Sequence, residues 1–412
     1  METIKNWDCE KDVVEMTSEL IRIPSINPPG DMREVSSFVE EYVRRLGLSV
    51  ETIESRPGMT NIVATLDAGE GPTLVFNGHM DVIPPGDPER WDWDPFGGDV
   101  RNGYVHGRGS SDMKGGLAGL LVALKKIVTF TDLKGKILFM AVPDEESGGD
   151  YGTGMLVEKG YIGDACLIAE PSGQNPTIGQ KGNLWLHAKT RGVSGHGSLS
   201  PLVGVNAIRE MNRVIDTIYE LWDINWSLPE LERSLIAESQ DILKDEGLAG
   251  PAGVLGRVSV NLGRICGGEK VNVIPGACEA EFDLRIPIGL STDEVLNELN
   301  RRLARLGIDS ASVLPKTPPR EANYTNPLHP FVQAVTTAIE TISGGPSRPM
   351  LQWASSDSRY FRYRGIPTVQ FGPAELDGIH GVNERVSVSS LVQSTRVYAL
   401  LARRMLTEGS LV

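Results

Sequence analysis

The stretch VFNGHMDVIPPG, from Val75 to Gly86, places a histidine and an aspartate directly after an apolar run. The apolar residues predict a buried strand, and the proline-rich end predicts a turn. In an open α/β sheet, ligands bind beyond the carboxyl ends of the strands. His79 can therefore offer a ring nitrogen to a metal, while the Asp81 carboxylate orients the ring through its other nitrogen. Such a pair on its own is also common on ordinary surfaces and in ordinary cores.

Further apolar runs around this stretch predict an α/β fold. They read NIVATL, TLVFN, KILFMAV and ACLIA, and a helical segment at 114–128 separates the second from the third. Strands that alternate with helices indicate α/β units around a buried, largely parallel sheet. The C-terminal part resumes this pattern, with a helix near 330–342, a strand at IPTVQF and a last helix that starts near Ser390.

The middle of the chain has a different pattern. The runs NLWLHAKT, RVSVNLGRI and CEAEFDLRI predict strands with partial alternation, and two helical stretches separate them. We therefore expect a small α+β domain at 180–316, inserted into a larger domain formed by residues 1–179 and 317–412. Residues 221–251 contain tryptophans, prolines and glycines without a clear period, so we expect a loop with a short helix there.

The composition narrows the range of partners. With 40 basic and 54 acidic residues, the net charge is −14, and no basic stripe is visible that would neutralise nucleic-acid phosphates. The same acidity disfavours an anionic membrane surface. The N-terminus METIKNWDCEKD lacks an apolar signal segment, and the four cysteines are scattered without a CxxC pair. We expect a globular cytoplasmic protein with no nucleic-acid or membrane partner.

Other residues of metal-ligating type follow the remaining predicted strands. GRGSSDMKGG places Asp112 just before a helix, VPDEESGG ends a strand with Glu145 and Glu146, and CLIAEPSG ends another with Glu170. DGIHGVNERVSV adds His380 in a glycine-flanked loop. Each has an ordinary alternative, since Asp112 suits a helix N-cap and the adjacent glutamates suit a solvated acidic turn. A parallel sheet brings strand ends to one edge, however, so the set as a whole predicts one site.

The ligand types indicate which metal such a site would bind. Two histidines and several carboxylates suit a borderline divalent ion, with zinc as the leading candidate. The ligands exceed the need of one catalytic zinc, but two metals bridged by one carboxylate would use them all. A structural zinc site is the alternative, although such sites usually close their coordination with cysteine and histidine. The spare glutamate, Glu145, favours catalysis. Nucleotide binding is disfavoured, because neither GxGxxG nor a P-loop is present.

A set of motifs, in order along the chain, resembles one enzyme family. GHMDV, GRGSSDMKGG, PDEESGG, AEPSG, GVSGHGS and IHGVNE are together similar to the dinuclear zinc family of acetylornithine deacetylase, succinyl-diaminopimelate desuccinylase, aminoacylase and carboxypeptidase G. The resemblance implies a zinc-aminopeptidase-like catalytic domain interrupted by a smaller lid domain, which in many members is also the dimer interface. It further implies two zinc ions per chain, which cobalt can replace, and a homodimer that forms through the lid.

The resemblance also assigns roles to the metal-ligating residues. His79 and Glu170 match ligands of one metal, Glu146 and His380 match ligands of the other, and Asp112 matches the bridging carboxylate. Some members have aspartate at the position that matches Glu170, so a glutamate lies within the family's pattern.

Five further positions match catalytic or substrate-binding residues of the family. Asp81 matches the carboxylate behind the metal ligand, and Glu145 matches the general base. In the predicted lid, His196 matches a histidine that reaches the active site of the other subunit in dimeric relatives and stabilises the oxyanion. Asn272 in VNVIPG and Arg285 in FDLRIP match positions associated with the substrate carboxylate and the oxyanion. The ordinary alternatives are a packed lid histidine, a turn-forming asparagine and a strand-surface arginine.

The activity that the resemblance implies is metal-dependent hydrolysis of the amide bond of an N-acyl amino acid, as in deacetylases and desuccinylases of amino-acid metabolism. A metallo-exopeptidase, either a carboxypeptidase or a dipeptidase, is the alternative, because it would use the same dinuclear site with a different pocket. The expected partner is therefore a small N-acyl amino acid or a short peptide.

Overall fold

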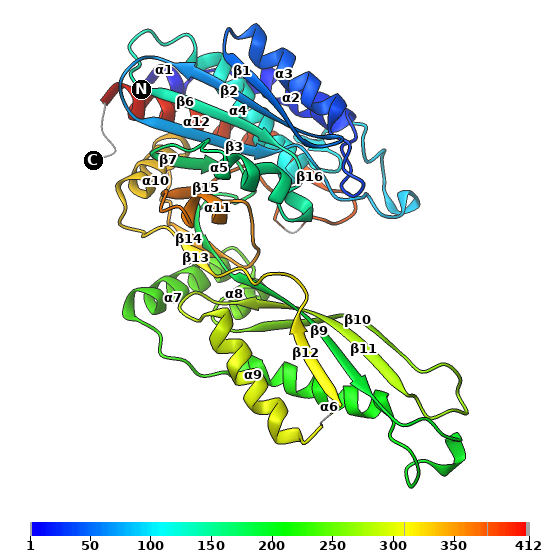
Figure 1. The fold of residues 1–412 in the computed structure, drawn as a ribbon. Helices are drawn as coiled ribbons and strands as arrows, with labels where there is room; N and C mark the ends of the chain where they lie inside the picture. Colours follow the sequence, from blue (N-terminus) through cyan, green and yellow to red (C-terminus); the bar gives the residue numbers. More distant parts are fainter. Residues whose placement is uncertain (1, 309, 377, 409–412) are drawn as a thin grey trace. The chain divides into compact units, whose positions relative to one another are not determined.

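The computed structural model describes residues 2–308, 310–376 and 378–408. The chain divides into two compact units, which are Met1–Ile178 with Thr325–Pro349 and Ser356–Val412, and Gly179–Tyr324 with Met350–Ser355. Figure 1 shows the elements of both, coloured along the sequence. Among the described residues, no helix is both long and apolar enough to cross a bilayer. The assignment of 180–316 as a lid and dimerisation domain stays a prediction.

A mixed sheet forms the centre of the first unit. Its strands are, in chain order, β1 (Ser49–Arg56), β2 (Met59–Asp67), β3 (Thr73–His79), β6 (Lys136–Val142), β7 (Ala165–Ile168), β8 (Thr177–Gln180) and β15 (Thr368–Gln370). They lie in the spatial order β1, β2, β6, β3, β7, β15, β8, and the last two residues of β8 belong to the second unit. The four strands from β6 to β15 are parallel, whereas the outer strands join antiparallel. The predicted α/β fold is confirmed, with parallel pairing confined to the centre of the sheet.

The other elements of the first unit are helices and one small sheet. The helices are α1 (Glu2–Lys5), α2 (Glu10–Arg22), α3 (Arg33–Arg45), α4 (Gly115–Ile127), α5 (Met155–Glu158), α10 (Pro330–Ser343), α11 (Ser358–Arg362) and α12 (Val388–Glu408). The small sheet consists of the antiparallel strands β4 (Asp99–Arg101), β5 (Tyr104–His106) and β16 (Arg385–Ser387). Through β16, the segment that follows His380 lies beside the segment that precedes Asp112.

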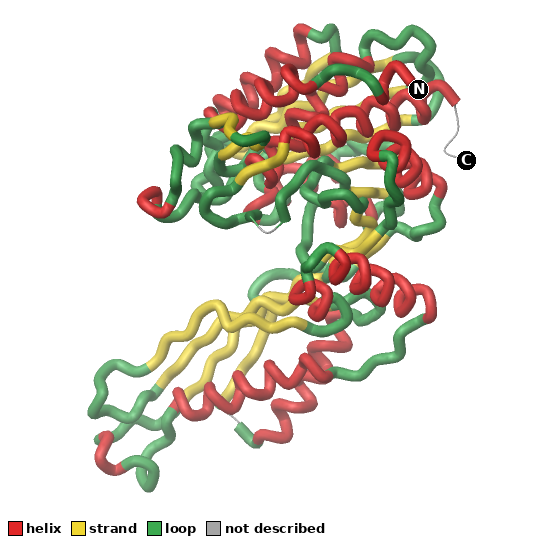
Figure 2. Tube along the Cα trace, turned by 180° about the vertical axis from the view of Figure 1, so that it is seen from behind, coloured by secondary structure: helices red, strands yellow, loops and turns green. Residues whose placement is uncertain are grey.

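Helices cover both faces of the large sheet (Figure 1, Figure 2). Val75 and Phe76 are neighbours in β3, so their side chains point to opposite faces. Val75 belongs to a buried cluster with Leu156 of α5 and Phe361 of α11. Phe76 faces Tyr398 of α12, with 6.3 Å between the ring centroids. Because both faces are covered, this strand is a continuous apolar run rather than an alternating one.

Two glycines allow α4 and the segment after β15 to approach the end of β7 closely. A Cβ atom at Gly116, in the first turn of α4, would lie 2.0 Å from the Ala169 carbonyl oxygen, and one at Gly372 would lie 2.2 Å from it. No side chain tolerates so short a distance to the backbone, so the contact requires glycine. This contact sets the start of α4, just after Asp112, against the residue that precedes Glu170.

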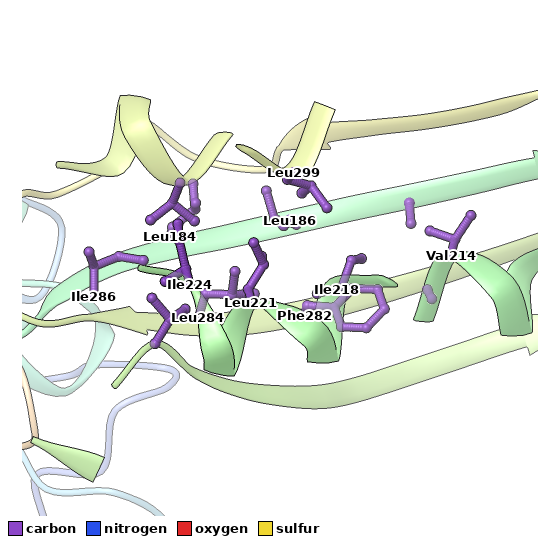
Figure 3. Packing of buried hydrophobic residues seen from close by; sticks show 14 of the residues in the cluster. Leu184, Leu186, Val214, Ile218, Leu221, Ile224, Phe282, Leu284, Ile286 and Leu299 are labelled. Carbon is purple, nitrogen blue, oxygen red and sulfur yellow. The ribbon is translucent and has the colours of Figure 1, made fainter. Parts of the chain in front are cut away.

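The second unit has an antiparallel sheet in the order β10 (Ser259–Gly267), β11 (Ala277–Ile286), β9 (Gly182–Arg191) and β12 (Ala311–Pro315). Its main helices are α6 (Ala207–Tyr219) and α9 (Thr292–Leu306). Buried and more exposed residues alternate along β9, as the sequence predicts for a strand with one covered face. The covered face forms a core in which Leu184 and Leu186 pack with residues of both helices, including Ile218 and Leu299 (Figure 3). Two short strands, β13 (Asn323–Tyr324) and β14 (Met350–Gln352), pair with the end of β8.

Residues 221–251 differ from the expected loop with a short helix. They contain α7 (Glu230–Asp245) and the start of α8 (Ala249–Val254). The buried residues of α7 follow one helix face, and they are Leu235, Ile236, Ser239, Ile242 and Leu243. The stripe is narrow, and the prolines, tryptophans and glycines on both sides of the helix obscure its period in the sequence.

Candidate metal and catalytic site

Three neighbouring parallel strands end at the same edge of the large sheet. His79 is the last residue of β3 and pairs with Val142, the last residue of β6. Asn77 pairs with Ile168, the last residue of β7. The segments that follow these strand ends therefore emerge side by side, as expected for ligands at the carboxyl ends of parallel strands. They carry four of the predicted site residues, which are Asp81, Glu145, Glu146 and Glu170.

The buried ring of His79 lies at the centre of the group. Its Nε2 is 3.2 Å from Asp112 Oδ1 and 3.9 Å from Glu170 Oε1. Its other ring nitrogen, Nδ1, is 2.9 Å from the backbone oxygen of Asp81. In the neutral ring, Nδ1–H donates to that oxygen and the Nε2 lone pair faces the carboxylates. This tautomer is the one that a metal ligand requires.

Asp112 lies between the two histidines. Its Oδ1 faces His79, and its Oδ2 is 3.2 Å from His380 Nε2. The residue lies in a helical turn, Ser110–Lys114, but its own φ of −121° and ψ of 96° are not helical. The capping position of α4 belongs to Lys114, and no side chain caps the helix there. Asp112 therefore presents its carboxylate to the site rather than serving as an N-cap.

Glu146 and His380 lie next to each other, and His380 also contacts Asp112. His380 Nε2 is 3.2 Å from Glu146 Oε2. His380 lies in the loop between β15 and β16 with a φ of 62°, and its side chain is half exposed. All the predicted metal ligands are thus brought together in the first unit.

Two overlapping sets of ligand atoms are close enough to hold metal ions. Within each set the atoms lie within 4.8 Å of one another, and the sets are His79 with Asp112 and Glu146, and His79 with Glu145 and Glu170. Glu145, the predicted general base, is therefore within the site and not beside it.

Burial makes the glutamates of this site hard to ionise in the metal-free protein. Burial and the neighbouring Glu170 raise the pKa of Glu145 well above its ordinary value. Burial raises the pKa of Glu170 in the same way, and burial together with Asp112 raises the pKa of Glu146 to about 7. Buried carboxylates of like charge destabilise one another unless a positive charge lies between them.

The histidines supply positive charge when no metal is bound. Hydrogen bonds to Asp112 and Glu146 raise the pKa of His380 to about 10. Burial lowers the pKa of His79, but hydrogen bonds to Asp112 and Asp81 outweigh burial, so the pKa lies well above 6.5. Burial raises the pKa of Asp112, yet its hydrogen bonds with both histidines reverse the effect and hold the pKa below its ordinary value. Protonated histidines would therefore offset part of the negative charge of these carboxylates in the metal-free protein.

The donor set fits two divalent cations. Glu146 Oε1 is buried without a hydrogen-bond partner in the described part of the chain, although buried polar atoms are nearly always paired. Imidazole nitrogens and carboxylate oxygens suit zinc and similar ions. Asp112, with one oxygen toward each histidine, is placed to contact both cations.

Asp81 contacts the turn that carries the acidic pair. Its carboxylate accepts hydrogen bonds from Asn27 Nδ2 at 2.8 Å and from the backbone N–H groups of Glu145 and Glu146 at 3.2 Å each. The carboxylate is 3.5 Å from His79 Nδ1, farther than the backbone oxygen of the same residue. Asp81 thus contacts the ring of His79 through its backbone oxygen and the backbone of Glu145 through its carboxylate.

The remaining predicted site residues, His196, Asn272 and Arg285, lie in the second unit. His196 is exposed, and the N–H of Gly197 donates to the Asn272 backbone oxygen at 2.8 Å. The loops that carry His196 and Asn272 are therefore adjacent. Arg285 forms an ion pair with Asp283, with 2.9 Å between Nε and Oδ1. The catalytic and binding roles of these residues stay predictions.

Asp357 and Glu384 are two of the buried acidic residues in the described part of the first unit that the predicted site does not include. Asp357, just before α11, is 1% exposed, and its charge contributes to the raised pKa of Glu145 and of Glu170. Glu384 is also 1% exposed and accepts a hydrogen bond from the backbone N–H of Asp112. Glu384 ends the motif IHGVNE, so the sequence contains a signal for it. Asp357 lies among serines that resemble an ordinary loop.

Comparison with known proteins identifies the family. The model of Peptidase family M20/M25/M40 matches residues 75–404. The chain belongs to this family. The match extends over every predicted metal ligand, from His79 to His380.

Curated members of the family match nearly the whole chain. A succinyl-diaminopimelate desuccinylase of Methylorubrum extorquens is 31% identical over 401 residues, which cover 93% of this chain and 96% of the relative. A succinyl-diaminopimelate desuccinylase of Methylocella silvestris is 30% identical over 408 residues, which cover 95% of this chain and 97% of the relative. The M20 chain is therefore an amide-cleaving hydrolase, as its motifs predict.

Solved structures share the fold. An M20 family metallo-carboxypeptidase from Sulfolobus solfataricus has a TM-score of 0.78 at 20% identity, covering 95% of this chain and 98% of that one. Human carnosine dipeptidase 1 has a TM-score of 0.76 at 19% identity, covering 98% of each chain. The predicted arrangement of a catalytic domain with a second, inserted domain is that of M20 peptidases.

The pKa shifts predict how pH affects the stability of the metal-free M20 chain. Glu146 has its pKa raised from 4.5 to about 7, and His380 has its pKa raised from 6.5 to about 10. Both groups bind a proton more tightly in the folded state, so each contributes stability at low pH that is lost as the pH rises through the folded-state pKa. The melting temperature of chelator-treated protein should therefore fall as the pH rises from 5 to 10. Glu146 acts in the lower part of this range, up to about pH 7, and His380 acts in the upper part, up to about pH 10.

A matched variant separates this effect from other titrations. Glu146→Gln lacks the titrating carboxyl group, so its melting temperature should fall less steeply over the same range. Zinc should stabilise the wild type more at high pH than at low pH, because metal binding requires deprotonated ligands. A melting temperature that rises with pH in the metal-free wild type would contradict the assignment.

Proposed function

We propose that the chain is a dinuclear zinc amidohydrolase that removes the succinyl group from an N-succinyl amino acid. The similarity to proteins named succinyl-diaminopimelate desuccinylase carries the proposal, since it covers 93% and 95% of the chain at 31% and 30% identity. Removal of another acyl group, such as acetyl, uses the same bond-breaking chemistry and differs only in the acyl pocket.

A metallo-exopeptidase is the second candidate. The metallo-carboxypeptidase and the carnosine dipeptidase among the solved structures support it through their fold, with TM-scores of 0.78 and 0.76. Their sequence identity to this chain is lower than that of the desuccinylases, at 20% and 19%. We therefore place exopeptidase activity behind desuccinylation.

The metal ions are proposed to be zinc, with cobalt able to replace it. His79 and Glu170 would hold one ion, Glu146 and His380 would hold the other, and Asp112 would contact both. When bound, the two cations would polarise the scissile carbonyl and lower the pKa of the attacking water. The distances of 3.9 Å between His79 and Glu170 and of 3.2 Å between His380 and Glu146 support this assignment, as does the unpaired buried oxygen of Glu146.

Glu145 is proposed to be the general base. Its carboxylate takes a proton from the attacking water and then delivers it to the leaving amine. Asp81 fixes the Glu145 backbone through the hydrogen bond at 3.2 Å, which limits the motion of the turn. The base thus acts from a rigid position, as a proton carrier requires.

The second unit is proposed to act as a lid and dimer interface. His196 donates a hydrogen bond to the oxyanion in the other subunit of a homodimer, while Asn272 and Arg285 bind the substrate. The adjoining loops of His196 and Asn272 support a shared role for these two residues. A cytoplasmic location, as for enzymes of amino-acid metabolism, belongs to the same proposal.

A substrate panel tests the proposed function. The zinc-loaded and cobalt-loaded protein would be assayed with N-succinyl, N-acetyl and dipeptide derivatives of the same amino acids, with release of the free amine as the readout. We expect the highest kcat/KM for an N-succinyl derivative, because a pocket built for the second carboxylate leaves buried polar groups unpaired when that carboxylate is missing. A dipeptide hydrolysed fastest would instead establish the exopeptidase.

A further inference from the structure

We propose that Glu384 and Ser111 are positioning residues that hold the two metal-ligand segments of Asp112 and His380 to each other. The inference rests on the proposed function, because it concerns the same metal centre. It assigns a task to a buried carboxylate that touches neither metal nor substrate in the proposed mechanism.

Glu384 is a buried carboxylate whose two oxygens are both occupied by the turn before α4. Its Oε2 accepts hydrogen bonds from Arg108 Nη1 at 2.6 Å and from the Gly109 N–H at 3.1 Å. Its Oε1 accepts from the N–H groups of Ser111 at 3.0 Å and Asp112 at 3.1 Å. One side chain thus contacts four residues of the turn that presents Asp112.

The contacts of Glu384 join segments that are far apart in the sequence. It lies four residues after His380 but 272 residues after Asp112 in the chain. Regular secondary structure does not fix the turn at this point, because the backbone of Asp112 departs from helical angles. The N–H groups of Ser111 and Asp112 would otherwise have to find other acceptors in a buried environment, where unpaired groups are costly.

Ser111 makes a second connection between the same two segments. Its hydroxyl donates to the Arg385 backbone oxygen at 2.8 Å and accepts from the Glu375 N–H at 3.0 Å. Glu375 and Arg385 stand on either side of His380 in the chain. Ser111, the residue next to Asp112, therefore contacts the chain on both sides of His380.

These contacts constrain the distance that matters for two-metal binding. Asp112 and His380 would share one cation, and their facing atoms are 3.2 Å apart. His380 lies in a half-exposed loop with a φ of 62°, so its position depends on how the loop is anchored. Loss of an outer partner of a metal ligand typically reduces metal affinity about 10–100-fold.

The test measures zinc binding to the full chain, together with the melting temperature of the metal-free form. Glu384→Gln preserves the volume but sets an amide NH₂ against N–H donors, whichever way the amide turns. Ser111→Ala removes only the hydroxyl and leaves the backbone contacts with Glu384 intact. Glu321→Gln is the matched control, because Glu321 also accepts a backbone N–H, from Thr292, but lies in the second unit.

The expected result is a change in zinc affinity that stability alone does not explain. Glu384→Gln should bind zinc about 10–100-fold more weakly, and Ser111→Ala should weaken binding in the same direction by about tenfold. Glu321→Gln should keep wild-type affinity even if its melting temperature falls. The cobalt-loaded Glu384→Gln protein should also show an altered visible absorption spectrum, because the ligand geometry around Asp112 changes.

The outcomes separate this role from the proposed function. Wild-type zinc affinity in both Glu384→Gln and Ser111→Ala overturns the positioning role, whatever happens to the melting temperature. If Glu384→Gln does not fold, Ser111→Ala decides alone by the same criterion. A wild-type protein that binds no zinc would instead remove the metal centre itself, and the positioning role with it.

Discussion

Replacing Glu145 by alanine should lower kcat by about 10²–10⁴-fold while leaving the metals in place, because the change removes a proton carrier. The residue is partly buried near Glu170, and its backbone N–H donates a hydrogen bond to Asp81. The contact with Asp81 involves only the Glu145 backbone, so the turn should keep its position when the side chain is removed. The measurement combines steady-state kinetics with the metal content of the purified variant.

Glu146→Ala is the comparison that gives this result its meaning. Glu146 neighbours Glu145 in sequence, but its Oε2 is 3.2 Å from His380 Nε2, on the other side of Asp112. Its removal should weaken one metal, and excess zinc should partly restore activity. The assignment is reversed if Glu145→Ala loses its metals while Glu146→Ala stays loaded and active.

His196→Ala should turn over about 10²–10³-fold more slowly, the usual cost of one lost oxyanion donor. The side chain is exposed in a glycine-flanked loop of the second unit, so its removal should not disturb a core. Zinc content and dimer mass should match the wild type. Kinetics, metal analysis and light scattering on the same preparation check these three expectations.

A mixture of two inactive variants tests whether His196 acts across a dimer. Homodimers of His196→Ala and of Glu145→Ala should each be nearly inactive. A heterodimer contains one active site with an intact Glu145 and an intact His196 from the other subunit, so part of the activity should return. If subunit exchange is demonstrated and no activity returns, His196 acts within its own chain or not at all.

The metal ligands could be predicted from the sequence because parallel strands impose a simple rule. His79 ends β3, while Glu146 and Glu170 follow β6 and β7, and the parallel register places all three strand ends at one edge. Asp112 and His380 do not lie at strand ends of the large sheet, and they are predicted from the order of the motifs along the chain. In both cases the information is local, since each residue type stands at a recognisable strand end or glycine-rich turn.

The remaining features depend on contacts between distant segments. The Asp81 carboxylate binds Asn27 and the backbone at Glu145, and no spacing in the sequence indicates either partner. The motif IHGVNE draws attention to Glu384, but its hydrogen bonds to the turn at Asp112 appear only when the two segments are placed side by side. The antiparallel outer strands of the sheet are equally hidden, because apolar runs alone do not reveal strand direction.

The close passage of α4 over Ala169 affects how distant relatives of this chain can be interpreted. With only 2.0 Å available for a Cβ atom at Gly116, even an alanine must displace the helix or the end of β7. Such a displacement would separate Asp112 from Glu170 although neither residue had changed. A homologue that retains every ligand but has lost this glycine is therefore a candidate for a degenerate enzyme. An inventory of ligands is then a poor guide to activity, and the absence of a side chain becomes as diagnostic as the presence of one.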